Sequence, residues 1–548
     1  MNYVDYTIVG LFLGMTFFIG AYFYFWVKSG DDFYVAGRQI TPFILASVIV
    51  VTNVNLFSFV GQSGIAYKQG ISIIWQPWTG NMALVFAGLF IVPIYRRLRI
   101  RTIPELLERR YGKGIRTMVA VLWIFRLSFW LGIVLYTGVV AAQAITGNPS
   151  FTFWVLVIGG IAIVYTALGG MFAVAFTDVI QFILMLLGAL IVLPLAMSLV
   201  DWWPGLMAQL PSDFMILVRN TGEFDWKFIL AIFFLGLEWA TVDQGLLQRT
   251  FSANSTKTAA RGLVLAGIIT TPFALLWLIP GMAASILHPG LANPDSAVPA
   301  LLRSLLPHGI LGLVICGLLS AQLSTIAGNL NGVATMITSD IYESIFNKRA
   351  DNKIILLVAR FMTFAVGIGM ILFAYWVPKM GGAVNAYLTL IAIMDMPLFI
   401  IAVVYGLFWK RCNWQGAIAG YLAGAAAGII GEFFLQYSFN QNTFLTAAVA
   451  LVVTPIVSVL TRRPDENKIA EVWQAKHVTE EEVKTGQVFN IIPVTTFGKA
   501  SLAVLFVGLS LFIIGIVVGN YDTTVASYLA VTGMIVYFIG GLSRTMAD

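Results

Sequence analysis

Two adjacent hydroxyl residues, Ser324 and Thr325, lie in the middle of an apolar run from about Gly309 to Ile337. An unsatisfied polar group inside a bilayer costs several kcal/mol, so such a cluster indicates a buried interface or an ion path. Ala321 precedes the pair by one helical turn, and the i, i+3, i+4 spacing places all three residues on one helix face. Backbone and hydroxyl oxygens on one face could form part of a site for a hard cation.

The composition points to a membrane protein, since 59% of the 548 residues are hydrophobic and only 11% are charged. A helix needs roughly 20 apolar residues to cross a hydrocarbon core about 30 Å thick, and about fifteen segments, among them 151–168 and 174–200, approach this length. We therefore predict an all-α polytopic membrane protein with about 14–15 transmembrane helices. The first, 5–27, is too long for a signal-peptide core and is expected to be retained.

The positive charge is concentrated in alternate loops of this map. The loop from Arg96 to Arg116 is rich in arginine, whereas the loops on the opposite side hold few basic residues. Because Lys and Arg gather in cytoplasmic loops, we expect the N-terminus outside and the C-terminus in the cytoplasm. The net charge of +6 then reflects topology, and no nucleic-acid partner is expected. The expected location is the plasma membrane, or the inner membrane of a bacterial cell.

Two predicted spans, 42–66 and 226–247, are interrupted by polar residues. The interruptions are Thr52-Asn53-Val54-Asn55 with Ser58, and Glu238-Trp239-Ala240-Thr241 with Asp243-Gln244. These are the second and seventh spans, so each opens a unit of five. An odd-numbered repeat places its two copies in opposite orientations, which is typical of secondary transporters with a site at the broken helices.

This pattern divides the chain into seven parts. They are a first span with a cytoplasmic loop (1–41), a first inverted repeat (42–200), an extracellular loop (201–225), a second inverted repeat (226–412), peripheral spans (413–461), a cytoplasmic loop (462–498) and C-terminal spans (499–548).

Six short strings, spread from about residue 30 to residue 412, resemble the sodium/solute symporter family, which includes the sodium/glucose cotransporters. They are DFYVAGR (32–38), TIPELLERRY (102–111), FTDVIQ (176–181), LQRT (247–250), SDIY (339–342) and GLFWK (406–410), in the family's order. The resemblance implies a leucine-transporter-like fold with an inverted five-helix repeat. It also implies sodium-coupled symport by alternating access, with Na+ as the coupling ion and a small-molecule substrate.

The family's main sodium site implies five ligands in this chain. Backbone carbonyls of Val51 and Val54 at the first break would meet the Ala321 carbonyl and the hydroxyls of Ser324 and Thr325. The chemistry is reasonable, because a helix break releases carbonyls and facing hydroxyls complete an oxygen shell. The alternative is that the two hydroxyls only permit close helix packing.

Some family members bind a second sodium ion through the aspartate of the TDVIQ string and hydroxyls one turn beyond the main pair. Asp178 is present here, but the downstream positions are Ala327 and Gly328, which removes two oxygen ligands. We therefore expect one sodium ion per substrate. Asp178 is either a second-sodium ligand or a structural hydrogen-bonding group.

The substrate pocket is expected at the broken helices. Sugar-binding members carry amide and carboxylate side chains at positions aligned with Ser58, Pro77, Gly236 and Thr389, and a lysine aligned with Thr270, and none of these is kept. The pocket should therefore not recognise a hexose in the same way. Our candidate pocket residues are Asn53, Asn55, Ser58, Gln76, Arg126, Glu238, Trp239, Thr389 and Asp395.

Three charged residues of this set lie inside predicted spans: Arg126, Glu238 and Asp395. Such charges are costly unless they are paired or face water. The planar fork of Arg126 suits a carboxylate, as it does in sialic-acid transporters of the family, which favours a carboxylate or zwitterionic substrate. Alternatively, Arg126 pairs with Asp395 or Glu238 and holds helices together.

Other functions fit the sequence less well. No nucleophile with a base, no cluster with metal-ligand spacing and no phosphate-binding glycine loop indicates an enzyme. A sodium/sugar symporter of the glucose, galactose or inositol type with an altered pocket remains an alternative. So does a transporter-like sensor, although only a few residues follow the last span. We expect a monomer surrounded by membrane lipids, and an oligomer is the alternative.

Overall fold

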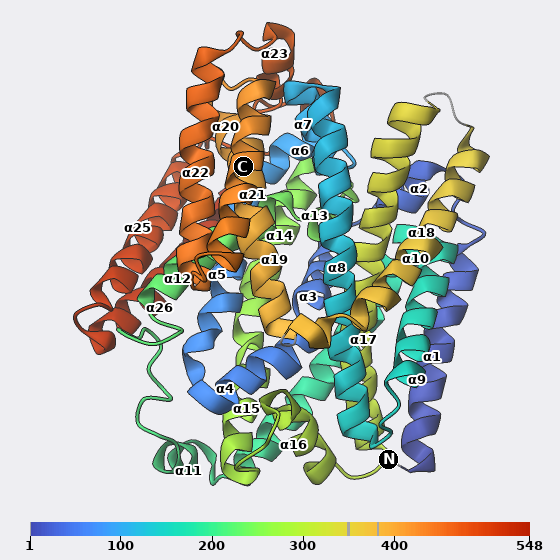
Figure 1. The fold of residues 1–548 in the computed structure, drawn as a ribbon, viewed down its shortest axis with the longest axis vertical. Coiled ribbons are helices and arrows are strands. Elements are labelled where there is room, and N and C mark those ends of the chain that lie inside the picture. The colour runs from blue at the N-terminus through green and yellow to red at the C-terminus, as the bar shows by residue number, and fades with distance from the viewer. Residues whose placement is uncertain (1, 348–350, 381–382, 548) are drawn as a thin grey trace.

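The structure is a computed structural model that describes residues 2–347, 351–380 and 383–547. Within these ranges nearly the whole chain is helical, with short 3-10 and π segments (η) between longer α-helices (Figure 1). The helices pack side by side as a bundle, with α1 at one edge and the pair α25 and α26 at the other. This confirms the all-α prediction.

The N-terminal part of the bundle contains α1 to α10. Its elements are α1 (Tyr3–Phe23), α2 (Gly30–Val35), η1 (Ala36–Arg38), α3 (Pro42–Asn53), η2 (Phe57–Gln62), α4 (Ser63–Gln69), η3 (Ile71–Ile74), α5 (Trp75–Phe86), η4 (Ala87–Ile91), α6 (Val92–Leu98), α7 (Ile103–Tyr111), α8 (Lys113–Thr146), α9 (Phe151–Trp154), η5 (Val155–Gly159) and α10 (Gly160–Ser198).

The middle part runs from α11 to α20. Its elements are α11 (Trp202–Gln209), α12 (Trp226–Val242), α13 (Gln244–Phe251), α14 (Thr256–Phe273), α15 (Leu275–Leu287), η6 (Pro294–Ser296), α16 (Ala297–Leu305), α17 (Ile310–Thr335), η7 (Met336–Phe346), α18 (Asn352–Ala374), η8 (Val377–Met380), α19 (Ala383–Phe399), η9 (Ile400–Val404) and α20 (Tyr405–Phe408). The C-terminal part contains α21 (Trp414–Phe433), α22 (Phe439–Leu460), α23 (Glu466–Gln474), α24 (Glu480–Thr485), α25 (Thr496–Val518) and α26 (Thr523–Ala547).

Among the described residues, 12 helices are long and apolar enough to cross a membrane, or up to 14 if each of two bent helix pairs is one span. One of the 12, Phe151–Ser198, has 48 residues. At 1.5 Å per residue it would be about 72 Å long, more than twice the hydrocarbon core. It bends at Gly170, whose positive φ of 53° interrupts the helix. We count it as two spans, in agreement with the predicted spans 151–168 and 174–200.

The first bent pair is α3 with η2 and α4, which meet at 46°. Val54 is extended (φ −103°, ψ 105°), and the Asn55 side chain accepts a hydrogen bond from the Phe57 N–H at 3.0 Å. The Thr52 hydroxyl bonds back to the Val48 carbonyl at 2.6 Å. Side chains therefore compete with the helical backbone bonds at the break, as short polar side chains do.

The second bent pair is α12 with α13, which meet at 44°. Asp243 separates the two helices in an extended conformation and caps α13, because its side chain accepts a hydrogen bond from the Leu246 N–H at 3.0 Å. Aspartate is a preferred N-cap residue. Both interruptions predicted from polar residues are thus confirmed as helix breaks.

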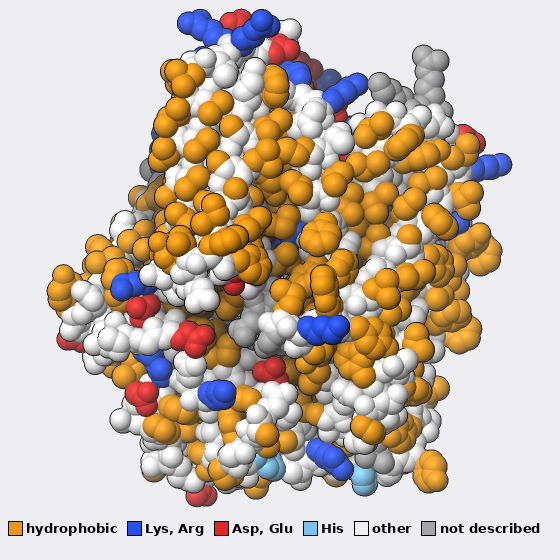
Figure 2. Space-filling model, in the orientation of Figure 1, with side chains coloured by type: hydrophobic (Ala, Val, Ile, Leu, Met, Phe, Trp, Pro, Cys, Tyr) orange, Lys and Arg blue, Asp and Glu red, His pale blue; other side chains and the backbone are white. Residues whose placement is uncertain are grey.

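Apolar side chains cover much of the visible outer face of the bundle, while Lys and Arg lie at its upper end and at scattered places over its middle and lower parts (Figure 2). Many large apolar side chains on the outer faces of α21 and α22 are exposed, for example Ile430, Phe433, Ile456 and Val459. An exposed apolar surface of this extent is expected for helices that face lipid.

The upper end of the bundle in Figure 1 is held by ion pairs between distant segments. Arg101 pairs with Asp31 at 2.8 Å and with Glu343 at 3.3 Å, and Arg116 pairs with the buried Asp340 at 2.7 Å. These contacts join the α2 region, the segment before α7, α8 and η7. They link parts of both predicted repeats.

The predicted loop 462–498 contains the short helices α23 and α24 and packs on this same end. Arg97 is buried and pairs with Glu482 at 3.1 Å, and Arg109 pairs with Glu471 at 2.9 Å. The loop therefore contacts the arginine-rich segments α6 and α7.

Candidate functional site

The first helix break faces α17 at the predicted hydroxyl pair. Ser324 and Thr325 are both buried. The Thr325 hydroxyl lies 3.0 Å from the Ala321 carbonyl on its own helix and 3.4 Å from the Thr52 carbonyl on α3. The structure thus brings the α17 oxygens to the end of α3, where a sodium site was predicted.

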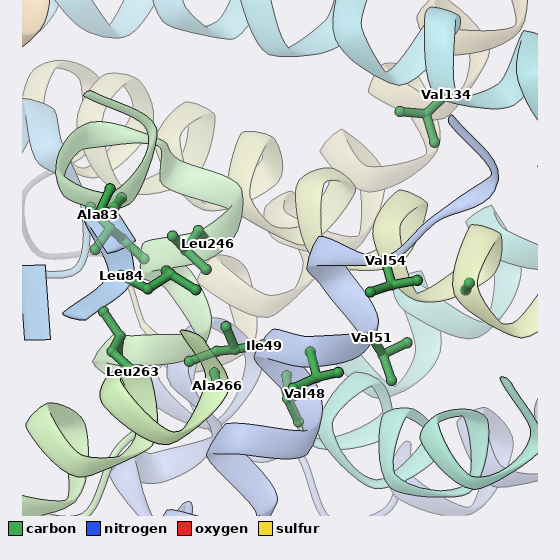
Figure 3. Packing of buried hydrophobic residues seen from close by; sticks show 14 of the residues in the cluster. Val48, Ile49, Val51, Val54, Ala83, Leu84, Val134, Leu246, Leu263 and Ala266 are labelled. Atoms are coloured by element: carbon green, nitrogen blue, oxygen red, sulfur yellow. The ribbon is translucent and has the colours of Figure 1, made fainter. Parts of the chain in front are cut away.

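The break also frees carbonyls on the last turn of α3. The helical backbone hydrogen bonds of α3 end with the bond from the Val54 N–H to the Val50 carbonyl at 3.0 Å. The Phe57 N–H donates to the Asn55 side chain instead of to a backbone carbonyl. Val51 and Val54 lie on this turn with their side chains in the packed core (Figure 3). Carbonyls at an interrupted helix end lack helical partners, and together with two hydroxyls they provide the hard oxygen donors that suit Na+.

Arg249 on α13 fills the space next to this junction. Its guanidinium donates to the Ser324 carbonyl at 2.8 Å and lies 3.4 Å from Asp178 on α10. Both charged side chains are completely buried. A Cβ added at Gly328 would overlap the Arg249 guanidinium, so this glycine provides the room that the cation occupies.

The role of Arg249 was missed from the sequence, although the residue belongs to the LQRT string. A single sequence does not reveal which side chain reaches a site about 75 residues away along the chain. Asp178 therefore has a structural partner here, which is one of its two predicted roles. Its Oδ1 has no hydrogen-bond partner among the described residues.

A polar cavity of about 130 Å³ lies between the two helix breaks. This is room for a small solute or several water molecules. Eight of the nine predicted pocket residues line it: Asn53, Asn55, Ser58, Gln76, Arg126, Glu238, Trp239 and Asp395. Thr52 and Thr325 also line it, so the cavity reaches the junction between α3 and α17.

The ninth residue, Thr389, is not among the residues that line the cavity. Its hydroxyl donates to Glu432 on α21 at 2.9 Å. Tyr387 and Asp395 on the same helix do line the cavity. At about 100° per residue, Thr389 is rotated by about 120° from Asp395, which turns it away from the cavity.

Several cavity residues were not predicted. Gln62 donates to the Gln76 side chain at 3.3 Å and accepts from the Trp277 indole at 2.9 Å. Phe57, Trp130 and Tyr387 form a cluster of aromatic rings with centroids 4.9–6.2 Å apart. Asp243 also lines the cavity. Its position at the second helix break could have identified it as a cavity residue, because the cavity lies between the two breaks.

Arg126 does not offer a free guanidinium to the cavity. It forms a two-pronged ion pair with Asp395, with Nε 3.0 Å from Oδ1 and Nη2 in close contact with Oδ2. Its Nη1 donates to Asp243 at 3.3 Å. The alternative in which Arg126 holds helices together is therefore the arrangement found, joining α8, α19 and the second break.

A helical membrane bundle with two broken spans, a polar cavity between them and released carbonyls at one break is the architecture of a secondary active transporter. The sequence model of the Sodium:solute symporter family matches residues 33–424. The chain belongs to that family.

The chain is 28% identical over 523 residues to the sodium/glucose cotransporter of Vibrio parahaemolyticus. The matched region covers 88% of this chain and 95% of the relative. It is 27% identical over 454 residues to the sodium/myo-inositol cotransporter 2 of Mus musculus, covering 75% and 66% of the two chains. The fold matches a solved sodium-coupled sialic acid symporter with a TM-score of 0.78 at 21% identity, over 85% of this chain and 99% of that one.

These comparisons establish sodium-coupled symport of a small molecule, with Na+ as the coupling ion, in a leucine-transporter-like fold. They also confirm the prediction that the protein is a transporter and not an enzyme.

Proposed function

We propose that the protein imports a small polar solute together with one sodium ion. The ion would be bound by the carbonyls of Val51, Val54 and Ala321 and by the hydroxyls of Ser324 and Thr325. Support comes from the Thr325 hydroxyl, which lies between the Ala321 and Thr52 carbonyls at the end of a broken helix. Because sodium would join the two repeats here, its binding and substrate binding would strengthen each other.

The observation that carries the one-sodium ratio is the Arg249 guanidinium beside Ser324. It places a fixed positive charge next to Asp178, where family members with a second sodium ion have a ligand. A second cation there would find the Asp178 carboxylate already paired with Arg249 and the adjacent volume filled by the guanidinium. In reconstituted vesicles, cotransport of one sodium ion with one neutral solute predicts a sodium Hill coefficient near one. It also predicts a reversal potential that corresponds to one charge transported per solute. A two-charge reversal potential would refute the ratio.

For the substrate we favour a donor-rich solute, either a polyol or a zwitterion. The pairing of Arg126 with two aspartates removes the main argument for a simple carboxylate. The cavity instead presents the amides of Asn53 and Gln76 and the Trp239 ring. Relatives named as glucose, myo-inositol and sialic acid transporters all act on hydroxylated solutes.

A thermal-shift screen would test the substrate class directly. Hexoses, inositols, monocarboxylates, amino acids and sialic acids would each be added in sodium and, separately, in potassium. We expect sodium-dependent stabilisation by a hydroxylated or zwitterionic compound, because a ligand stabilises only the state that binds it. Stabilisation by monocarboxylates alone would contradict the proposal.

We further propose an N-terminus outside and a monomer in the plasma membrane. The arginines of α6 and α7 lie at the end of the bundle that also carries α23, which the positive-inside rule assigns to the cytoplasm. The division into repeats 42–200 and 226–412 remains a prediction. Labelling of single cysteines placed in the α11 segment and in loop 462–498 would test the orientation from either side of the membrane.

A further inference from the structure

Four charged side chains meet at the wall of the cavity, and their charges do not balance. Arg126, Glu238, Asp243 and Asp395 line it, and each is at most 5% exposed. They comprise three carboxyl groups and one guanidinium. Full ionisation would leave two uncompensated negative charges on side chains that are almost completely buried, which is strongly unfavourable.

The Arg126 guanidinium forms ion pairs with two of the three carboxyl groups. Arg126 binds both oxygens of Asp395 and one oxygen of Asp243. Glu238 is not among its hydrogen-bond partners. The Glu238 carboxyl instead interacts electrostatically with the neighbouring Asp395 carboxyl, which lines the same cavity, and its Oε1 is buried without a hydrogen-bond partner among the described residues.

The other titratable groups that face this cluster add no positive charge. They are Tyr387 on α19 and Tyr421 on α21, which interact with Arg126, Glu238 and Asp395. Both phenols are neutral near pH 7. Two neighbouring carboxyl groups that are almost completely buried are stable together when they hold one proton, because two carboxylates side by side repel strongly.

We propose that Glu238 and Asp395 share one bound proton at neutral pH, with Glu238 as the neutral acid. This inference deepens the proposed symport function, on which its meaning for the substrate rests. Asp395 is the ionised partner, since Arg126 holds both of its oxygens, and Glu238 donates its proton to it. The pocket therefore has a proton site, built from α12 and α19, that is separate from the sodium site.

The shared proton determines what the pocket can recognise. A neutral Glu238 keeps an acceptor oxygen on a side chain that lines the cavity, which suits a solute hydroxyl or amide. Loss of the proton would place a second negative charge against Asp395 and drive α12 and α19 apart. Because α12 carries the second helix break, proton release would be coupled to the geometry of the cavity.

Infrared difference spectroscopy on the purified full-length protein tests the proposal without a known substrate. Glu238→Gln keeps the shape and a hydrogen-bond donor to Asp395 but cannot carry the proton. We expect the wild type at neutral pH to show a carboxylic-acid carbonyl band, sensitive to deuterium exchange, that this variant lacks. Asp178→Asn is the matched control, because Asp178 is equally buried and faces an arginine, and the Glu238 band should persist in it.

An unchanged band in Glu238→Gln, with normal thermal unfolding, would overturn the proposal. Asp395→Asn gives an independent check: it removes the ionised partner, so the Glu238 band should shift in frequency, and an unshifted band would equally contradict a shared proton. Sodium-dependent thermal stabilisation, measured on the same samples, tests the symport function separately. Failure of sodium binding would then be distinguishable from absence of the proton.

Discussion

Replacing Thr325 by valine should weaken sodium binding by about ten- to a hundredfold. Thr325 is buried, and its hydroxyl is the group that lies between the Ala321 and Thr52 carbonyls. Valine has the same shape but no oxygen. A hydrogen-bonding or ligand contact to a charged group contributes about 1.5–3 kcal/mol. Since about 1.4 kcal/mol corresponds to a tenfold change in affinity, this range gives the expected loss.

The loss of stability should be much smaller, because valine fills the same volume and a neutral hydrogen bond contributes only about 1 kcal/mol. The assay is the melting temperature of purified protein as sodium replaces potassium at constant ionic strength, since stabilisation depends on the ratio of ligand concentration to Kd. Thr325→Ser retains the hydroxyl and should keep most of the sodium affinity.

The matched control is Thr363→Val on α18. Thr363 is also buried, and its hydroxyl bonds back to the Ala359 carbonyl of its own helix at 2.8 Å. This variant should leave the sodium titration unchanged. Sodium affinity within twofold of wild type in Thr325→Val, or an equal loss in Thr363→Val, would refute the assignment of Thr325 as a sodium ligand.

Three further substitutions test the packing around the site. Gly328→Ala should lower the melting temperature and weaken sodium binding, because the added Cβ overlaps the Arg249 guanidinium and disrupts its buried ion pair. Breaking a buried ion pair costs roughly 3–5 kcal/mol. A normal sodium titration and normal stability would contradict this packing. Arg126→Ala should destabilise the protein by a similar amount, about 3–5 kcal/mol, since it strands buried carboxylates; a wild-type denaturation midpoint would show that the ion pair is unimportant. Glu482→Ala should leave sodium binding unchanged but speed proteolysis of loop 462–498, because Arg97 loses its buried partner; equal cleavage rates would argue against this attachment.

The helix breaks could be predicted because their cause is local. Asn55 and Asp243 are short polar residues within apolar runs, and each side chain bonds to a nearby backbone N–H in place of the helical pattern. The hydroxyl pair on α17 was identifiable for a similar reason, because polar groups are rare and costly at mid-membrane depth. Features fixed within a few residues of the chain are visible in the sequence.

Features set by tertiary packing could not be predicted in the same way. Thr389 was placed in the pocket by its alignment with family positions, but the rotation of α19 turns it toward Glu432. Pairing of Arg126 with Asp395 or with Glu238 was one alternative from the sequence, and the fold shows that the partners are Asp395 and Asp243. Which of several intramembrane carboxyl groups meets an arginine depends on helix packing, which no local pattern encodes.

Gly328 shows how the sequence and the structure can give two different reasons for the same prediction. In the sequence it counts as a missing oxygen ligand for a second sodium ion, and the prediction of one ion followed from that absence. In the structure, its lack of a side chain is what allows the Arg249 guanidinium to lie beside Asp178 and Ser324. Restoring a serine at this position should therefore not create a second sodium site. The hydroxyl would compete with the buried guanidinium for the same space, and Asp178 would still be paired with Arg249.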